Sequence, residues 1–134
     1  MAGRETGSAG FSAATPWLPL SSDHAQRNVE VQRDDPASML GLYRALLSLR
    51  RARPSLSLGS YAELDTGARV LGYARELHGV RDVVLLNIGS EHERITLPGL
   101  ASASVLISTH LNRSDRVFDG ALLPDEALVL DTSR

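Results

Sequence analysis

The strongest hydrophobic pattern in the sequence lies between Asp35 and Pro54, where apolar residues recur with the spacing of an α-helix. Asp35 is a suitable N-cap, Pro36 suits the first helical position, and Pro54 ends the segment. About half of the helix circumference is covered by large apolar residues, namely Met39, Leu40, Leu42, Tyr43, Leu46, Leu47 and Leu49. A surface helix needs a narrower apolar face. We therefore expect this helix to lie between two partners, of which the chain need not contain both.

Three arginines, Arg50, Arg51 and Arg53, stand at the end of this segment. Guanidinium groups can bind phosphate, but positive charge in the last helical turn also complements the helix dipole. We expect the second role, which is the commoner one at this position.

Residues 1–34 show no convincing periodicity, and the small and polar residues up to Thr15 are typical of a loop. Pro16 and Pro19 enclose Trp17 and favour extended or polyproline geometry between them. The only extended candidate before the helix is residues 28–31. More than thirty irregular residues at the start of a domain are unusual, so we expect a mobile segment or one that packs on a neighbour outside the chain.

After the helix the apolar residues alternate with a period of two. This pattern predicts strands over residues 56–64, 70–77, 83–88, 91–97, 104–109 and 127–130. Val83 to Ile88 is apolar on both faces, which predicts a central strand. The fold class is therefore mainly β with one long N-terminal helix, and the strands form a small antiparallel sandwich or open barrel. Three parts follow: an irregular segment over 1–34, a helix over 35–54 and a β domain over 55–134.

Composition narrows the classes of function. The chain has 134 residues, enough for one modest domain, and its net charge of −2 offers no general attraction to nucleic acid or to an anionic membrane. All 14 basic residues are arginine, which we ascribe to codon bias because they are scattered. Cysteine is absent, so disulfides and thiolate sites are excluded.

Met1 to Ala14 lacks the apolar core of a signal peptide, and no stretch is long enough to span a bilayer. We expect a cytoplasmic protein.

Three carboxylate pairs were candidates for acid–base chemistry. Asp34 and Asp35 stand at a helix start, where capping explains them. Glu91 and Glu93 share one face of a predicted edge strand, where charge blocks edge pairing. Asp125-Glu126 follows a proline in a turn and is expected to be solvated.

The histidines do not suggest a metal site or a catalytic triad. They lie in four separate segments, none at the spacing of metal ligands: His24, His78, His92 and His110. Ser22-Asp23-His24 contains the residue types of a triad, but adjacent residues do not normally converge in space. No glycine loop opens a helix. The sequence therefore offers no catalytic residue, no cofactor-binding residue and no metal ligand.

A combination of short motifs nevertheless points to a family. It consists of Gly10-Phe11-Ser12, Pro16-Trp17-Leu18-Pro19-Leu20, Asn28-Val29, Gln32, residues 35–40, residues 43–50, Gly59-Ser60-Tyr61 and the later run Val83 to Gly89. From about Gly10 onward the chain closely resembles the C-terminal end of α-glucosidases of the α-amylase superfamily, glycoside hydrolase family 13, which includes oligo-1,6-glucosidases and trehalose-forming enzymes. The residues before Gly10 depart from the family pattern.

The resemblance implies that residues 16–20 follow the eighth strand of a (β/α)₈ barrel, that the helix from Asp35 is the eighth barrel helix, and that an amylase-type C-terminal β domain follows. The family cleaves α-glucosidic bonds with retention, using carboxylates on earlier barrel strands. A barrel takes about 250 residues, so it does not fit here, and no carboxylate of this chain matches the catalytic motifs.

These inferences lead to a C-terminal structural fragment of an α-glucosidase-type enzyme that is not active alone. Its partner would be the missing catalytic barrel, supplied within the parent enzyme or as a separate chain. Without the barrel, we expect self-association through the exposed helix face. The alternative is a stand-alone carbohydrate-binding or protein-interaction module that uses Trp17, or Tyr61 with Tyr73, as sugar platforms.

Overall fold

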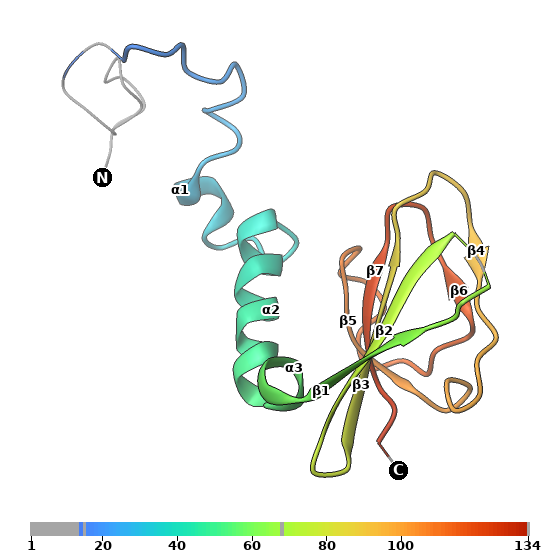
Figure 1. The fold of residues 1–134 in the computed structure, drawn as a ribbon. Helices are drawn as coiled ribbons and strands as arrows, with labels where there is room; N and C mark the ends of the chain where they lie inside the picture. The colour runs from blue at the N-terminus through green and yellow to red at the C-terminus, as the bar shows by residue number, and fades with distance from the viewer. Residues whose placement is uncertain (1–13, 15, 68, 134) are drawn as a thin grey trace. The chain divides into compact units, whose positions relative to one another are not determined.

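The computed structural model describes residues 14, 16–67 and 69–133, which form two compact units (Figure 1). One unit ends at Gly41 and the other begins at Leu42, within helix α2 (Met39–Ala52). The predictions made for residues 1–13 lie outside the described residues. No helix in the described part of the chain is long and apolar enough to cross a membrane.

The first unit contains a one-turn helix, α1 (Val29–Gln32), where the sequence predicted an extended segment. The prediction was wrong because the Asn28 side chain accepts a hydrogen bond from the Val31 backbone N–H at 2.9 Å. This N-cap contact favours a helical turn over the extended form that the two valines prefer.

Helix α2 has 14 residues and begins later than its sequence pattern predicted. Asp35 does not cap it, because its Oδ1 accepts from the Ala37 N–H at 2.9 Å and forms a separate turn. The cap is Ser38, whose Oγ accepts from the Gly41 N–H at 3.0 Å. A Cβ on Gly41 would lie only 2.6 Å from the Pro36 carbonyl oxygen. The turn before the helix therefore requires glycine at this position.

The segment after α2 divides into a one-turn helix, α3 (Ser55–Leu58), and strand β1 (Ser60–Leu64), instead of the single strand predicted over 56–64. Pro54 has helical φ and ψ, and its carbonyl accepts from the Leu58 N–H at 2.8 Å. The fixed φ of proline therefore starts a new helical turn at the point where it ends the preceding helix.

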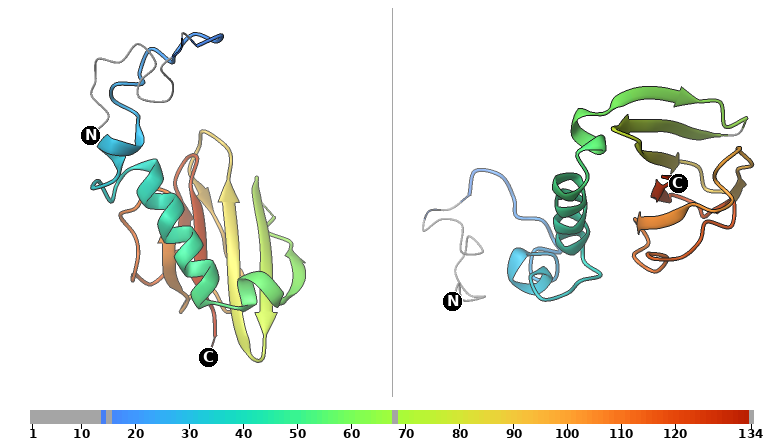
Figure 2. Two further views of the ribbon diagram at one scale, coloured as in Figure 1. Left: turned by 90° about the vertical axis from the view of Figure 1, so that its left-hand side faces the viewer. Right: turned by 90° about the horizontal axis from the view of Figure 1, so that it is seen from below.

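The second unit is built on a five-stranded antiparallel sheet with the order β1-β2-β3-β7-β5 (Figure 2). Its other strands are β2 (Val70–Leu77), β3 (Val80–Asn87), β5 (Ser104–Ser108) and β7 (Ala127–Asp131). The predicted central strand is confirmed as β3, which pairs with β2 on one side and β7 on the other. The prediction for residues 91–97 was too long, since only β4 (Glu93–Arg94) forms there, paired with β6 (Ala121–Leu122), which was not predicted.

The two faces of β3 have different surroundings. Val83 and Leu85 are fully buried and lie opposite Leu130 and Leu128 of β7. They belong to a hydrophobic core made of Val70, Ala74, Val83, Leu85, Ile95, Leu100, Ala103, Val105, Phe118, Leu122, Leu128 and Leu130. The alternate residues of β3 point to the opposite face of the sheet, which we call the outer face. This outer face bears the site described next.

Candidate functional site

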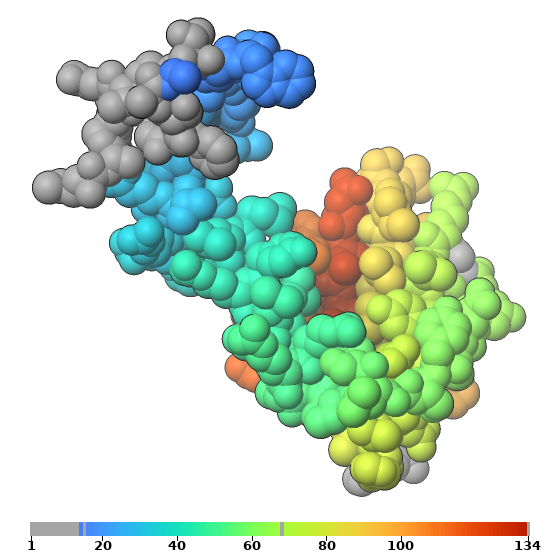
Figure 3. All heavy atoms as spheres, turned by 60° about the vertical axis from the view of Figure 1, so that its left-hand side comes forward, coloured from blue at the N-terminus to red at the C-terminus, as the bar shows by residue number. Residues whose placement is uncertain are grey.

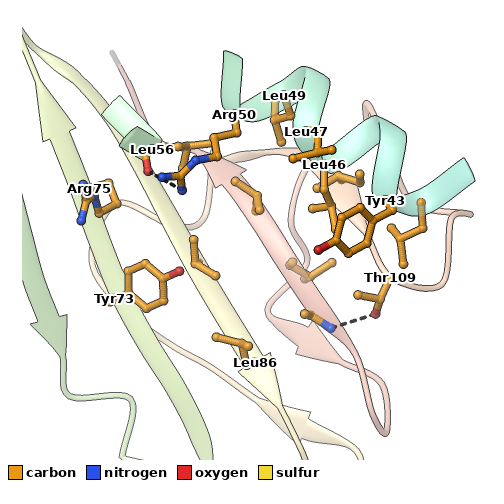
Figure 4. A pocket seen from close by; sticks show the side chains of 16 residues that line it. Tyr43, Leu46, Leu47, Leu49, Arg50, Leu56, Tyr73, Arg75, Leu86 and Thr109 are labelled. Atoms are coloured by element: carbon orange, nitrogen blue, oxygen red, sulfur yellow. Dashed lines mark hydrogen bonds between the residues drawn. The ribbon is translucent and has the colours of Figure 1, made fainter. Parts of the chain in front are cut away.

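A groove of about 480 Å³ lies between α2 and the outer face of the sheet. Its walls are mainly aliphatic: Leu42, Leu46 and Leu49 from α2, Leu56 from α3, and Val84, Leu86, Ile107, Leu128 and Val129 from the strands. Figure 4 shows side chains of the helix and of the sheet facing each other across this space. In Figure 3 red atoms of β7 remain uncovered beside the helix. The groove is therefore an open apolar surface.

Three polar side chains along the groove, those of Arg50, Arg75 and Thr109, are engaged within the chain. Arg50 Nη1 donates to the Leu56 carbonyl at 3.3 Å, and Arg75 donates to the carbonyls of Ser55 and Ser57, each at 3.3 Å. Thr109 Oγ1 accepts from the Ala127 N–H at 3.0 Å. The described residues that line the groove include no carboxylate and no histidine. This arrangement can bind apolar surface, but it holds no group for proton transfer near neutral pH.

Helix α2 also exposes a second apolar strip next to the groove. Met39, Tyr43 and Leu47 recur every four residues, with exposed fractions of 69, 63 and 44 %. Residues at this spacing lie on one side of a helix, and Tyr43 and Leu47 also border the groove. Tyr43 and Leu47 therefore extend the apolar surface of the groove onto the exposed helix, and exposed apolar surface of this kind marks interaction sites.

Arg53 joins the end of α2 to the sheet by two ion pairs. Its Nη2 lies 2.7 Å from Asp82 Oδ1, and its Nη1 lies 3.0 Å from Asp131 Oδ2. Asp82 and Asp131 oppose each other on β3 and β7, and Asp82 is fully buried. The Ser55 hydroxyl donates to the other oxygen of Asp82. The expectation that Arg53 complements the helix dipole was wrong, because the helix ends at Ala52 and the guanidinium neutralises two buried or half-buried carboxylates.

Two members of this cluster, Arg53 and Asp131, have shifted pKa values. Burial lowers the pKa of Arg53, but hydrogen bonds to Asp82 and Asp131 outweigh it, so the pKa is raised above its ordinary value. For Asp131, burial raises the pKa, and the opposing hydrogen bonds from Ser133 and Arg53 leave it below its ordinary value. Folding therefore favours the charged form of both groups.

The lowered pKa of Asp131 predicts how the free energy of unfolding depends on pH. Because the pKa of Asp131 is lowered in the folded state, its contribution is present above its unfolded pKa of about 3.9 and is lost as the pH falls through the folded value. We expect Asp131→Asn to lower the free energy of unfolding at pH 7, and the difference from the unmodified chain to shrink below about pH 4. Urea unfolding followed by circular dichroism from pH 3 to 7 measures this, with the exposed Glu91→Gln as control. A difference that stays constant over this range would contradict the assignment.

A second buried ion pair lies away from the groove. Arg113 Nη1 lies 2.8 Å from Glu126 Oε2, and Arg113 Nη2 lies 2.8 Å from Asp119 Oδ1. Glu126 also accepts from the Ser108 hydroxyl at 2.7 Å and from the Leu123 N–H at 2.8 Å. The expectation that Glu126 is solvated was wrong. The signal that could have indicated its burial is its place directly before the apolar alternation of β7.

The other residues weighed as catalytic candidates do not converge. Asp23 accepts from Ser21 rather than Ser22 and pairs with Arg27 at 3.4 Å. Glu91 and Asp125 are exposed, and Asp125 has a positive φ of 51°. The four histidines remain in separate segments on exposed positions. Within residues 14, 16–67 and 69–133 no group of three His, Cys, Asp or Glu side chains is placed to hold a metal ion.

Two tyrosines that the sequence suggested as sugar platforms do come together. The rings of Tyr61 on β1 and Tyr73 on β2 have centroids 5.4 Å apart and planes inclined by 31°. Tyr73 also lines the groove, whereas Tyr61 is 58 % exposed. Trp17 belongs to the first unit and is 90 % exposed.

Comparison with known proteins finds a family model and several relatives that match this chain. Residues 1–59 match the family model described as "Alpha amylase, catalytic domain". A probable alpha-glucosidase of Rhizobium meliloti is 42 % identical over 89 residues, which is 66 % of this chain and 16 % of that protein. The human amino acid transporter heavy chain SLC3A1 is 33 % identical over 129 residues, or 92 % of this chain and 18 % of that one.

Solved structures of the same family also resemble this chain. Trehalulose synthase MutB from Pseudomonas mesoacidophila MX-45 superposes with a TM-score of 0.82 and 30 % identity over 95 % of this chain and 24 % of its own. The chain thus spans less than a quarter of the length of these relatives. It belongs to the α-amylase family, glycoside hydrolase family 13, and is similar there to one portion of the α-glucosidase-type members.

Proposed function

We propose that the chain is the C-terminal structural portion of an α-glucosidase-type protein. In this proposal residues 1–34 are a barrel loop, residues 35–54 are the last helix of a (β/α)₈ barrel, and residues 55–134 are the β domain, a sandwich in which the β4–β6 pair belongs to the second layer. Its role is to cover one side of a catalytic barrel and to hold the last helix. It has no hydrolytic activity of its own.

One observation supports this division more than any other. The match to the catalytic-domain model ends at residue 59, and β1 begins at Ser60. The loop and the helices therefore resemble part of the catalytic domain, whereas the sheet lies beyond it. A boundary at this point is what the last barrel helix followed by a separate β domain would produce.

The apolar surface of α2 supports a barrel as the partner. Covering a large apolar side chain contributes about 1.5–3 kcal/mol when burial is complete. Met39, Tyr43 and Leu47 are 69, 63 and 44 % exposed, so a partner that covers them would contribute part of this amount from each, about 3–5 kcal/mol together. The barrel is that partner when it is present, and self-association through the same face is the expected substitute when it is absent.

The relatives support a structural role rather than a particular reaction. One relative is named as a glucosidase and another as a transporter heavy chain, yet both share this portion. Retaining glycosidases place two carboxyl groups about 5–5.5 Å apart across the substrate. The buried Glu126 is held by Arg113 and Ser108 and does not line the groove, so we assign it no catalytic role.

The proposal predicts two results with a chromogenic α-glucoside. The purified chain alone gives no turnover above a blank, because the catalytic carboxylates are elsewhere. A fusion in which this chain replaces the matching portion of the Rhizobium meliloti relative is active, and Leu47→Glu in the fusion lowers the activity at least fivefold by placing a charge on the covered face. Initial rates per folded protein measure the effect, and Ser48→Glu, which adds the same charge on another exposed side of α2, is the control.

Turnover by the repurified chain would contradict the proposal, and so would a fusion that is insensitive to Leu47→Glu. Equal losses in the Leu47→Glu and Ser48→Glu fusions would mean that charge on the helix, and not covering of the apolar strip, is what matters.

A carbohydrate-binding or protein-interaction module is the second candidate, favoured by the pairing of Tyr61 with Tyr73. Titration with maltotriose distinguishes the sugar-binding form. Saturable shifts in the amide spectrum that disappear in Tyr61→Leu would support the module. A cytoplasmic location, with no nucleic-acid or membrane partner, remains part of the main proposal and rests on the sequence alone.

A further inference from the structure

The two edges of the five-stranded sheet are not equally protected. At the β5 edge, the Val105 N–H donates to the Arg116 carbonyl at 2.8 Å, and the Asp115 N–H donates to the Val105 carbonyl at 2.8 Å. Ser104 also forms a bridge with Val117. The loop over 115–117 therefore covers the edge of β5 and satisfies part of its backbone.

The edge formed by β1 has no such cover within the described chain. β1 pairs only with β2, through all five of its residues. Residues 60–63 are exposed, and Figure 2 shows the green strand β1 at the outside of the sheet. Proline, lysine and bulges commonly protect such edges, but the sequence Ser-Tyr-Ala-Glu-Leu contains no proline or lysine and its pairing with β2 is regular. The outer backbone groups of β1 are thus available to another strand.

The side chains of β1 suit a second copy of β1 in one register. Antiparallel pairing about a two-fold axis at Ala62 matches all five residues and places Glu63 opposite Tyr61 of the other copy. If the two-fold axis instead passed through Glu63, the Glu63 side chains of the two copies would lie directly opposite each other, and directly opposed like charges are destabilising. One register is therefore both the longest and free of charge conflict.

Charges on the neighbouring strand favour the same register. Tyr61 lies opposite Arg75 and Glu63 lies opposite Tyr73 within each sheet. Pairing at Ala62 would align four side chains in a row across the two copies. Arg75 on β2 and Tyr61 on β1 come from one copy, and they are followed by Glu63 on β1 and Tyr73 on β2 of the other copy. Each row then contains one positive and one negative side chain at next-nearest strand positions.

We propose that two copies of this chain associate edge to edge through β1, antiparallel and centred on Ala62, to form a continuous ten-stranded sheet. The interface consists of one short strand from each copy, well below the size of a standard stable interface. The complex is therefore weak and forms at high protein concentration. It is independent of the barrel-covering role and leaves the groove and α2 unused.

The absence of cysteine permits a direct test by cross-linking. Opposed Cα atoms in an antiparallel pair lie about 4.5–5.5 Å apart, within the range of a disulfide. We expect Ala62→Cys to form a disulfide dimer under mild oxidation at least fivefold faster than Ser90→Cys, which is exposed in the turn after β3. Adding Glu63→Lys to Ala62→Cys places two positive charges in each row and should return the rate to the Ser90→Cys value.

Further variants separate this interface from association through α2. Arg51→Cys, one turn beyond Leu47 on an exposed position of α2, reports association through that side of the helix, and adding Glu63→Lys should leave its cross-linking rate unchanged. Equal rates for Ala62→Cys and Ser90→Cys would overturn the proposal, as would an Ala62→Cys rate that Glu63→Lys does not change. In the unmodified chain, amide exchange in β1 should slow as the concentration rises, and protection that is independent of concentration would also overturn it.

Discussion

Replacing Arg53 by methionine should lower the free energy of unfolding by about 3–5 kcal/mol, the cost of leaving a buried charge without its partner. Arg53 is the cation that faces Asp82 and Asp131, and Asp82 is fully buried. Without the guanidinium, two carboxylates on adjacent strands oppose each other. Urea unfolding followed by far-ultraviolet circular dichroism measures the change. Trp17 fluorescence is unsuitable because Trp17 is exposed and belongs to the other unit.

Two variants determine whether charge or packing causes the loss. Arg51→Met removes an exposed arginine from the last turn of α2 and should cost less than about 1 kcal/mol, because it loses only the dipole interaction. The double variant Arg53→Met/Asp82→Asn should recover part of the loss, since a neutral amide replaces the buried carboxylate. A double variant as unstable as Arg53→Met alone would show that the packing of the Arg53 side chain, rather than charge, matters.

Replacing Arg113 by methionine should cause a loss of similar size, about 3–5 kcal/mol. The side chain of Glu126 is fully buried, and Arg113 is its cationic partner. Arg113 also donates to the Ala121 carbonyl at 3.0 Å and pairs with Asp119. Its removal should therefore also release the loop over 112–120, which hydrogen exchange would detect as faster exchange at the Phe118 amide.

The matched control for this variant is Arg116→Met, which removes an exposed arginine from the same loop. It should change the free energy of unfolding by less than about 0.5 kcal/mol. If Arg116→Met and Arg113→Met accelerate exchange at Phe118 equally, the ion pair with Glu126 is not what holds the loop.

The elements of the sheet were predictable where the pattern was long and regular. The alternation over residues 70–77 predicted β2 with its observed bounds, and the two-sided apolar run at Val83 predicted a central strand. The predictions failed where a few hydrogen bonds decide the local conformation. Asn28 capped a turn that the valines would otherwise extend, and Ser38 rather than Asp35 began α2.

The candidate site was predictable only in part. The width of the apolar face on α2 already indicated two partners, and the structure shows that part of this face borders the groove while Tyr43 and Leu47, beside it, stay exposed. The ion pairs of Arg53 and Arg113 join residues far apart in the chain, 29 and 13 positions from their buried acids. No local pattern could reveal those pairings, so the sequence assigned Arg53 to the helix dipole and Glu126 to solvent.

The sequence by itself determined the helix, most of the strands and the resemblance to one family, because hydrophobic spacing and turn residues act over a few positions. The tertiary structure decided which carboxylates are buried, which sheet edge is free and how α2 stands over the sheet. These features depend on side chains brought together by strand order and register. The balance between the cost of burying a charge and the benefit of its ion pairs exists only once those groups are assembled.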